Sequence, residues 1–201
     1  MKKLISKSTK LTKVITVEDR GKLYDIIQER LIKSSDLDLS DINVSKITSF
    51  DDLFFDCGAT TINVSGWNIS NATDLSEMFA NCKSLQEIIG LETWNMSNAE
   101  DIMGMFYYCK DLRKMNISTW NIENCKDMSF LFADCSDLET LGGKEITLNC
   151  KSSSDVTKMF LNCYSLKGII HLENVSKHAN GVNLLDEQSK NMTGLLDVQI
   201  V

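Results

Sequence analysis

Five cysteines recur along the chain at nearly constant spacing, and their thiols have the widest chemical repertoire of its side chains. Each follows a phenylalanine by three residues, and the pairs are separated by steps of 25, 27, 26 and 28 residues. A column of thiols on adjacent units could oxidise or bind a metal ion. Cysteine is also a small apolar core residue. We therefore interpret the pairs as a structural repeat core, formed by Phe54/Cys57, Phe79/Cys82, Phe106/Cys109, Phe132/Cys135 and Phe160/Cys163.

Two further cysteines, Cys125 and Cys150, lie outside this pattern. They are the better candidates for reactive thiols, and they carry the remote alternative that the chain is a thiol-based redox protein or enzyme. The seven cysteines form no CxxC or CxxxC zinc pattern and no framework typical of a small secreted domain. Free thiols in a reducing compartment are the expected state.

Other candidate ligands favour structural roles. Asp36, Asp38 and Asp41 have the start of a calcium-loop spacing, but the sixth place of the loop lacks glycine and its closing place holds Ile47 instead of glutamate. Capping and solvation explain these aspartates better. The two histidines of the chain, His171 and His178, are expected on the surface.

The sequence contains no GxGxxG, GxxxxGK[ST], HExxH or GxSxG motif. No motif in the sequence therefore supports a phosphate-binding, zinc-protease or hydrolase function. We expect no catalytic residues, no metal site and no cofactor, and a protein that is not an enzyme.

The elements that position the cysteines are tandem copies of one supersecondary unit. Counting from each phenylalanine as position 0, apolar residues also occupy positions −4, −1 and +3. These spacings predict one face of a short helix in each copy. Position −5 holds residues that cap helices, and they are Ser49, Asp74, Asp101, Asp127 and Asp155.

An extended segment is expected between the helices. It contains Trp67, Trp94 and Trp120, each 12 residues before the next phenylalanine. The chain has no proline, as expected where every coil pairs with its neighbours through backbone hydrogen bonds. Asparagines precede the helices at positions 71, 98 and 124. We predict that their amides satisfy backbone groups at a tight corner.

These residues carry a resemblance to a known family. The runs WNISNATDLSEMF (67–79) and WNMSNAEDIMGMF (94–106) resemble the signature W-[DN]-V-S-N-V-T-D-M-S-x-M-F of the BspA-like leucine-rich repeat surface proteins of bacteria. The similarity spans about residues 36–170. It implies a leucine-rich-repeat-like solenoid of short strands and short helices. Together with the five copies and a helix expected at the N-terminal end, the predicted fold class is an α/β repeat with about five turns and an N-terminal helical cap. The resemblance further implies adhesion or protein recognition, with no catalytic residues to carry over.

Four regions are predicted along the chain. Residues 1–15 are a basic flexible tail, and residues 16–46 form an N-terminal cap made of a helix over about 17–33 and an extended segment. Residues 47–170 form the leucine-rich repeat solenoid. Residues 171–201 form a C-terminal cap, with a closing strand over 194–201.

Charge limits the partners. Residues 1–13 hold five of the 21 basic residues and no acid, which leaves a net charge of −12 on the rest. We therefore expect no nucleic-acid binding by the acidic body and no membrane insertion. The location stays open: free cysteines and no visible signal peptide favour a cytoplasmic or phage-associated protein, whereas the family resemblance favours the cell surface.

The prediction that follows is a non-enzymatic module that recognises or adheres to a protein. Binding would spread over equivalent outward positions of successive turns. Tyr107, Tyr108 and Tyr164 are the candidate binding residues, because aromatic side chains anchor many interfaces. The alternative is an architectural component, such as a phage virion or surface-layer subunit, which would self-associate or assemble into a larger particle.

Overall fold

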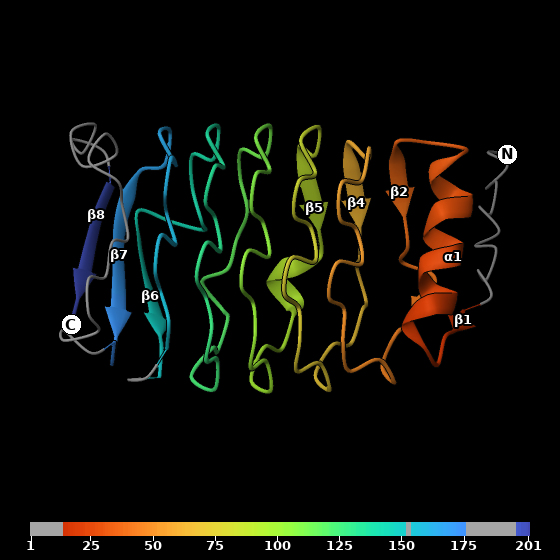
Figure 1. Cartoon of the computed structure of the whole chain (residues 1–201), viewed down its shortest axis with the longest axis horizontal. Coiled ribbons are helices and arrows are strands. Elements are labelled where there is room, and N and C mark those ends of the chain that lie inside the picture. Colours follow the sequence, from red (N-terminus) through yellow and green to blue (C-terminus); the bar gives the residue numbers. More distant parts are fainter. Residues whose placement is uncertain (1–13, 152–153, 176–195) are drawn as a thin grey trace, which may run out of the picture.

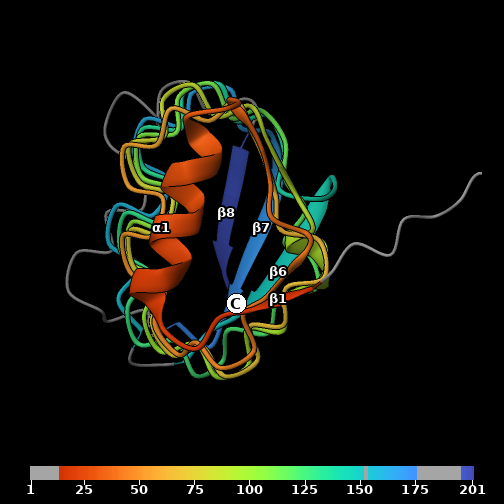
Figure 2. The ribbon, with the colours of Figure 1, turned by 90° about the vertical axis from the view of Figure 1, so that its right-hand side faces the viewer.

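The computed structural model describes residues 14–151, 154–175 and 196–201. The chain forms a β-solenoid of about six turns, one more than predicted. Figure 1 shows the coils side by side along the long axis, with α1 at one end and β6–β8 at the other. Viewed along that axis, the coils superimpose on a common outline (Figure 2). Repeat stacking is thus the organising feature of the fold. The predicted tail over 1–15 lies almost entirely outside the described residues.

Parallel strands form one side of the coils toward both ends of the stack, and between β5 and β6 that side has only an isolated parallel bridge, from Lys114 to Thr140. In the middle sheet, β4 pairs on one edge with β2 and on the other with β5, so that Ile62 lies opposite both Leu37 and Ile88. The strand predicted over 194–201 is found as β8, paired with β7. The strands are β1 (Ile15–Thr16), β2 (Asp36–Asp38), β3 (Ile42–Asn43), β4 (Thr61–Asn63), β5 (Glu87–Ile89), β6 (Glu145–Asn149), β7 (Gly168–Glu173) and β8 (Leu196–Ile200).

The short helices predicted around each phenylalanine are wrong: these segments are successive tight turns, which we call the turn ladder. The amide of Phe54 donates to the carbonyl of Met78 in the next coil (2.8 Å), whereas the amide of Cys57 donates back to Phe54 (3.0 Å). Amides thus alternate between the neighbouring coil and their own turn. The turn ladder comprises residues 50–57, 75–82, 102–109, 128–135 and 156–163.

The coil spacing explains why helices do not form. Parallel strands pair about 4.8 Å apart, whereas packed helices need about 8–10 Å between their axes. One helix per coil would therefore force the coils apart on that side and bend the stack. The flat ladder keeps both sides at strand spacing, and the stack in Figure 1 is correspondingly straight. The predicted inward positions −4, −1, 0 and +3 are nevertheless all buried.

A ladder of phenylalanine rings runs through the core. Neighbouring rings are nearly parallel, with centroids 5.0 to 5.7 Å apart from Phe54 to Phe160. Each later cysteine of the column points its thiol at the carbonyl of the preceding coil's phenylalanine, as Cys109 Sγ does to Phe79 O at 3.0 Å. A thiol fits there because it is both apolar in bulk and a weak donor. The same contact recurs for Cys82, Cys135 and Cys163.

The predicted asparagine column is confirmed at one corner. The amides of Asn71, Asn98 and Asn124 each donate to a serine carbonyl one coil earlier, at 2.7 to 2.8 Å. The recurring Asn-x-Ser triplets have a separate role, because the asparagine oxygen accepts the serine amide two residues on, as in Asn95 to Ser97 (3.1 Å). Asparagine therefore closes the corners and links the coils.

The described residues contain one α-helix, α1 (Arg20–Leu31), which lies within the range predicted at 17–33. Its N-cap is Asp19, whose side chain accepts the amide of Lys22. Leu23 and Ile27 are fully buried and join the same core cluster as the coils. Arg30 forms a bidentate ion pair with Asp41 after β2, at 2.6 and 2.9 Å. The helix is thus fastened to the first coil by apolar packing and by charge.

One coil departs from the repeat at its tryptophan. The indoles of Trp67 and Trp120 donate to the carbonyls of Leu39 and Leu91, whereas Trp94 Nε1 is buried without a hydrogen-bond partner among the described residues. The local cause is a longer corner, where the 3-10 helix η1 (Leu91–Thr93) follows Gly90. A side chain on that glycine would collide with the backbone of the preceding coil.

We therefore expect Trp94→Phe to lower the free energy of unfolding by about 1 kcal/mol less than Trp67→Phe or Trp120→Phe does. All three substitutions lose similar apolar contact. Only those at Trp67 and Trp120 lose a hydrogen bond, whereas Trp94→Phe removes an unpaired donor. Urea unfolding followed by circular dichroism measures the difference. Equal losses in all three variants would mean that the Trp94 indole is paired.

Candidate functional site

The outward face of the turn ladder presents the aromatic side chains singled out in the sequence. Positions −4, −1, 0 and +3 face the core, and the exposed side chains of this face come from the residues between them, although some of those, such as Ala80 and Ala133, are buried too. Tyr107 is 38% exposed, and Tyr108 beside it is half-buried. The structure places both on one coil, in the middle of the stack. The neighbouring coil adds an aromatic residue that the sequence had not suggested, Phe130.

These three side chains form a continuous cluster, which we call the aromatic patch. The ring centroids of Tyr107 and Tyr108 are 5.9 Å apart, and the Phe130 ring meets Tyr107 edge-on at 6.5 Å. Lysines lie against the patch: Lys110 Nζ is 4.2 Å from the centre of the Tyr108 ring, and Lys158 Nζ is 5.4 Å from that of Phe130. The patch can thus offer aromatic surface and cationic hydrogen-bond donors together.

Tyr164, the third predicted binding residue, lies two coils further along the ladder. It is half-buried, and its hydroxyl donates to the side-chain oxygen of Asn162 at 2.6 Å. Its ring therefore packs beside its own coil, in a different setting from Tyr107.

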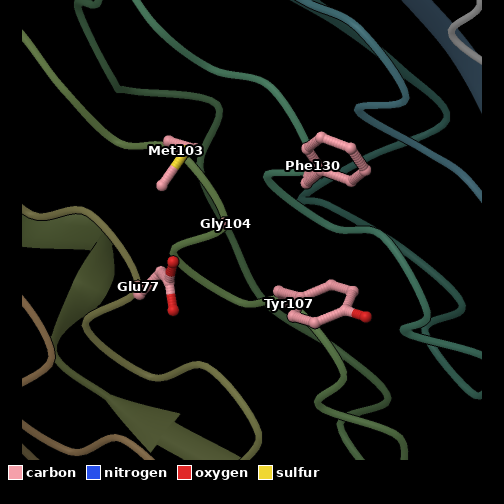
Figure 3. Close-up of a pocket in the computed structure, with 5 residues that line it drawn as sticks. All are labelled: Glu77, Met103, Gly104, Tyr107 and Phe130. Carbon is pink, nitrogen blue, oxygen red and sulfur yellow. The ribbon is translucent and has the colours of Figure 1, made fainter.

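A pocket of about 270 Å³ opens beside the aromatic patch (Figure 3). It is lined by Glu77, Met103, Gly104, Tyr107 and Phe130. In Figure 3 the carboxylate of Glu77 and the Phe130 ring lie on opposite sides of Gly104, with Met103 and Tyr107 completing the wall. The lining is mostly apolar, with a carboxylate at one side. Such a cavity can take an aliphatic or aromatic group that carries a polar end.

The backbone of Phe130 makes its position unusual. Its φ is +58°, a left-handed conformation that bulky residues rarely adopt and that costs about 1–2 kcal/mol. The conformation belongs to the ladder, since Glu77, Gly104 and Lys158 have it at the same position −2. Glycine, asparagine or aspartate would suit this position better than phenylalanine. Phe130 is half-buried, and the ladder holds its ring beside Tyr107 despite this preference.

The cysteines predicted to be reactive are buried. Cys125 is fully buried and Cys150 is 2% exposed, and burial raises the pKa of each thiol to about 12. The pKa values of the column cysteines are raised too, mainly by the neighbouring thiol for Cys57 and Cys82 and by burial for Cys109, Cys135 and Cys163. The folded protein therefore offers no activated thiolate at these positions, contrary to the expectation for Cys125 and Cys150.

Thiol labelling provides a direct check. With a pKa near 12, about one in 10,000 of the Cys125 and Cys150 thiols is ionised at about pH 8. We expect iodoacetamide to modify both at least about 100-fold more slowly in the folded chain than in concentrated guanidinium, with the folded rate rising as the pH rises. Peptide mass spectrometry locates the label. Rapid folded-state labelling of either cysteine would restore the redox alternative.

The remaining candidate ligands are engaged by neighbours. Asp36 accepts the hydroxyl of Thr60, Asp38 accepts the amide of Asn63, and Arg30 lowers the pKa of Asp41 by hydrogen bonding. His171 Nε2 lies 2.7 Å from Glu145 Oε1 across β6 and β7. His178 lies outside the described residues. Within the described ranges, no three His, Cys, Asp or Glu side chains form a group that could hold a metal ion.

The fold and the outward patch define a β-solenoid repeat protein. Its sequence matches the family model described as "Mycoplasma protein of unknown function, DUF285", over residues 30–90 and 86–195. The chain therefore belongs to this family. Searches of curated proteins and of solved structures found no match. In the described part of the chain, no helix has the length and apolarity needed to cross a membrane.

Proposed function

We propose that this chain is a non-enzymatic protein-recognition or adhesion module of the BspA-like leucine-rich repeat type, and that its partner binds the aromatic patch on the turn ladder. The observation that carries the proposal is the cluster of Tyr107, Tyr108 and Phe130, contributed by two coils and rimmed by lysines. In this account α1 and the strand β8 close the two ends of the stack.

The chemistry of the patch suits a protein partner. Tyrosine and phenylalanine supply large contact areas and lose little conformational entropy when a partner covers them. Interface energy is usually concentrated in a few such residues near the centre, with polar groups around them. Tyr107 and Phe130 occupy the centre here, and Lys83, Lys110 and Lys158 supply the rim. The net negative charge of the body gives little attraction for a nucleic-acid backbone.

Affinity capture tests the proposal. The intact chain is immobilised and exposed to extract of the organism that encodes it, beside a Tyr107→Ser/Tyr108→Ser variant. We expect the variant to retain at least about 10-fold less of the captured partner, as for loss of central interface aromatics. The matched control is Tyr24→Ser, because Tyr24 is 44% exposed but lies on α1. It should leave capture unchanged.

Two results would contradict this assignment. Undiminished capture by the correctly folded double variant would mean that the patch is not the binding surface. Recovery of the chain itself as the sole partner would favour the architectural alternative, in which coils of different copies assemble. Circular dichroism of each variant shows whether the fold is intact.

A further inference from the structure

The pocket beside the aromatic patch arises from one missing side chain. Position −2 of the turn ladder points outward in every coil and is occupied, in order, by Asp52, Glu77, Gly104, Phe130 and Lys158. Only the middle coil lacks a side chain there. A Cβ on Gly104 would lie 3.4 Å from Glu77 Cγ and 3.6 Å from Tyr107 Cβ. The glycine therefore forms the floor of a gap between a carboxylate and an aromatic ring.

The carboxylate of Glu77 is placed for an external partner. It is half-buried, and it forms no ion pair with any residue in the described part of the chain. Burial, and then repulsion from Asp52 on the preceding coil, raise the pKa of Glu77. Covering it with an apolar group would leave a desolvated charge unpaired, which is costly. A cationic group would instead be stabilised there.

The rest of the lining suits the shape of an arginine side chain. Met103 and the Gly104 backbone present an apolar surface for an aliphatic stem, and Tyr107 and Phe130 present rings to a flat cation. A guanidinium stacks on aromatic rings and binds a carboxylate through two parallel hydrogen bonds. Lys158 belongs to the coil after Phe130 and is not among the residues that line the pocket, although its Nζ lies 5.4 Å from the centre of the Phe130 ring.

We propose that this pocket binds the arginine side chain of a partner protein, with the guanidinium paired to Glu77 and packed against Tyr107 and Phe130. The inference rests on the proposed recognition function and names the chemistry of its anchor. It also explains how an acidic repeat protein would select a partner: a basic side chain enters the pocket while acidic or polar groups meet the lysines around Tyr108.

Titration of the full chain with a small probe tests this directly. Nα-acetyl-arginine N-methylamide is added to isotopically labelled protein, and backbone amide signals are followed by NMR. We expect saturable shifts at Gly104, Tyr107 and Phe130, with a dissociation constant of about 1 mM or weaker for a single side chain. The citrulline analogue has nearly the same shape without the charge. It should bind at least about 10-fold more weakly, because it cannot pair with Glu77 as a cation.

Variants assign the effect to the pocket. Glu77→Gln should weaken binding of the arginine probe at least about 5-fold, whereas Glu87→Gln on strand β5 should leave it unchanged. The lysine analogue should bind more weakly than arginine because it is not planar. Equal binding of arginine and citrulline, an unaffected Glu77→Gln variant, or shifts confined to another surface would overturn the proposal.

The outcome separates this inference from the broader one. Failure of the arginine probe, with partner capture still lost in the tyrosine variant, would remove the arginine pocket and leave the recognition face in place. Undiminished capture in the tyrosine variant would remove the recognition face whatever the probe does.

Discussion

Phe106→Ala is expected to lower the free energy of unfolding by about 4 kcal/mol, which is the loss typical of a buried phenylalanine replaced by alanine. The ring is fully buried between those of Phe79 and Phe132, at 5.5 and 5.6 Å, and Trp120 packs against it at 6.3 Å. Straight coils at fixed spacing cannot collapse onto the cavity without breaking ladder hydrogen bonds. Thermal unfolding should therefore begin about 10 °C lower.

The adjacent tyrosine is the matched control for this substitution. Tyr107→Ala changes the next residue on the same coil, but its side chain lies on the outer face, so we expect a loss within about 1 kcal/mol. Urea denaturation followed by circular dichroism compares the two variants. Similar losses would mean that the phenylalanine column does not carry the stability of the stack.

Ile27→Asp is expected to destabilise the protein by about 4 kcal/mol and to promote its aggregation, because it buries an unpaired charge. Ile27 is fully buried on the inner face of α1, in the same core cluster as the coils. Detachment of the helix would expose apolar side chains and unpaired backbone groups at the end of the stack. Size-exclusion chromatography and urea denaturation measure both consequences.

Ile32→Asp provides the comparison at the end of the same helix. Ile32 is 86% exposed, so the same new charge stays in water, and we expect a change within about 0.5 kcal/mol. A monomeric Ile27→Asp chain with unchanged unfolding would contradict the proposal that α1 closes the stack.

The repeat and its inward positions could be predicted from the sequence because they depend on residue type at fixed spacing. The phenylalanine and cysteine of each copy recur in register, and all of them are buried. The helices could not be predicted correctly, because spacings of three and four are equally compatible with a chain of tight turns. Coil spacing decides between the two, and it is a tertiary property. The residues at position −5 are typical helix caps and do not discriminate either. Asp74 accepts the amide of Ser76, as an N-cap residue would, but it begins a tight turn.

The candidate site was only partly visible in the sequence. Tyr107 and Tyr108 stand out in the sequence as an aromatic pair. Gly104 and Phe130 can be recognised as neighbours only when the residues at position −2 of successive copies are compared. That column was available from the aligned copies and would have shown a glycine between Glu77 and Phe130. The left-handed backbone of this position, which makes Phe130 unexpected, depends on the ladder itself.

The proposed recognition surface is tested most directly by site-specific photocrosslinking. A benzoylphenylalanine is introduced in place of Tyr107 on the turn ladder or, separately, in place of Tyr24 on α1, and each chain is irradiated in extract of the encoding organism. We predict a specific crosslinked protein from position 107 and none from position 24. Crosslinking from position 24 alone, or equally from both positions, would contradict binding at the aromatic patch.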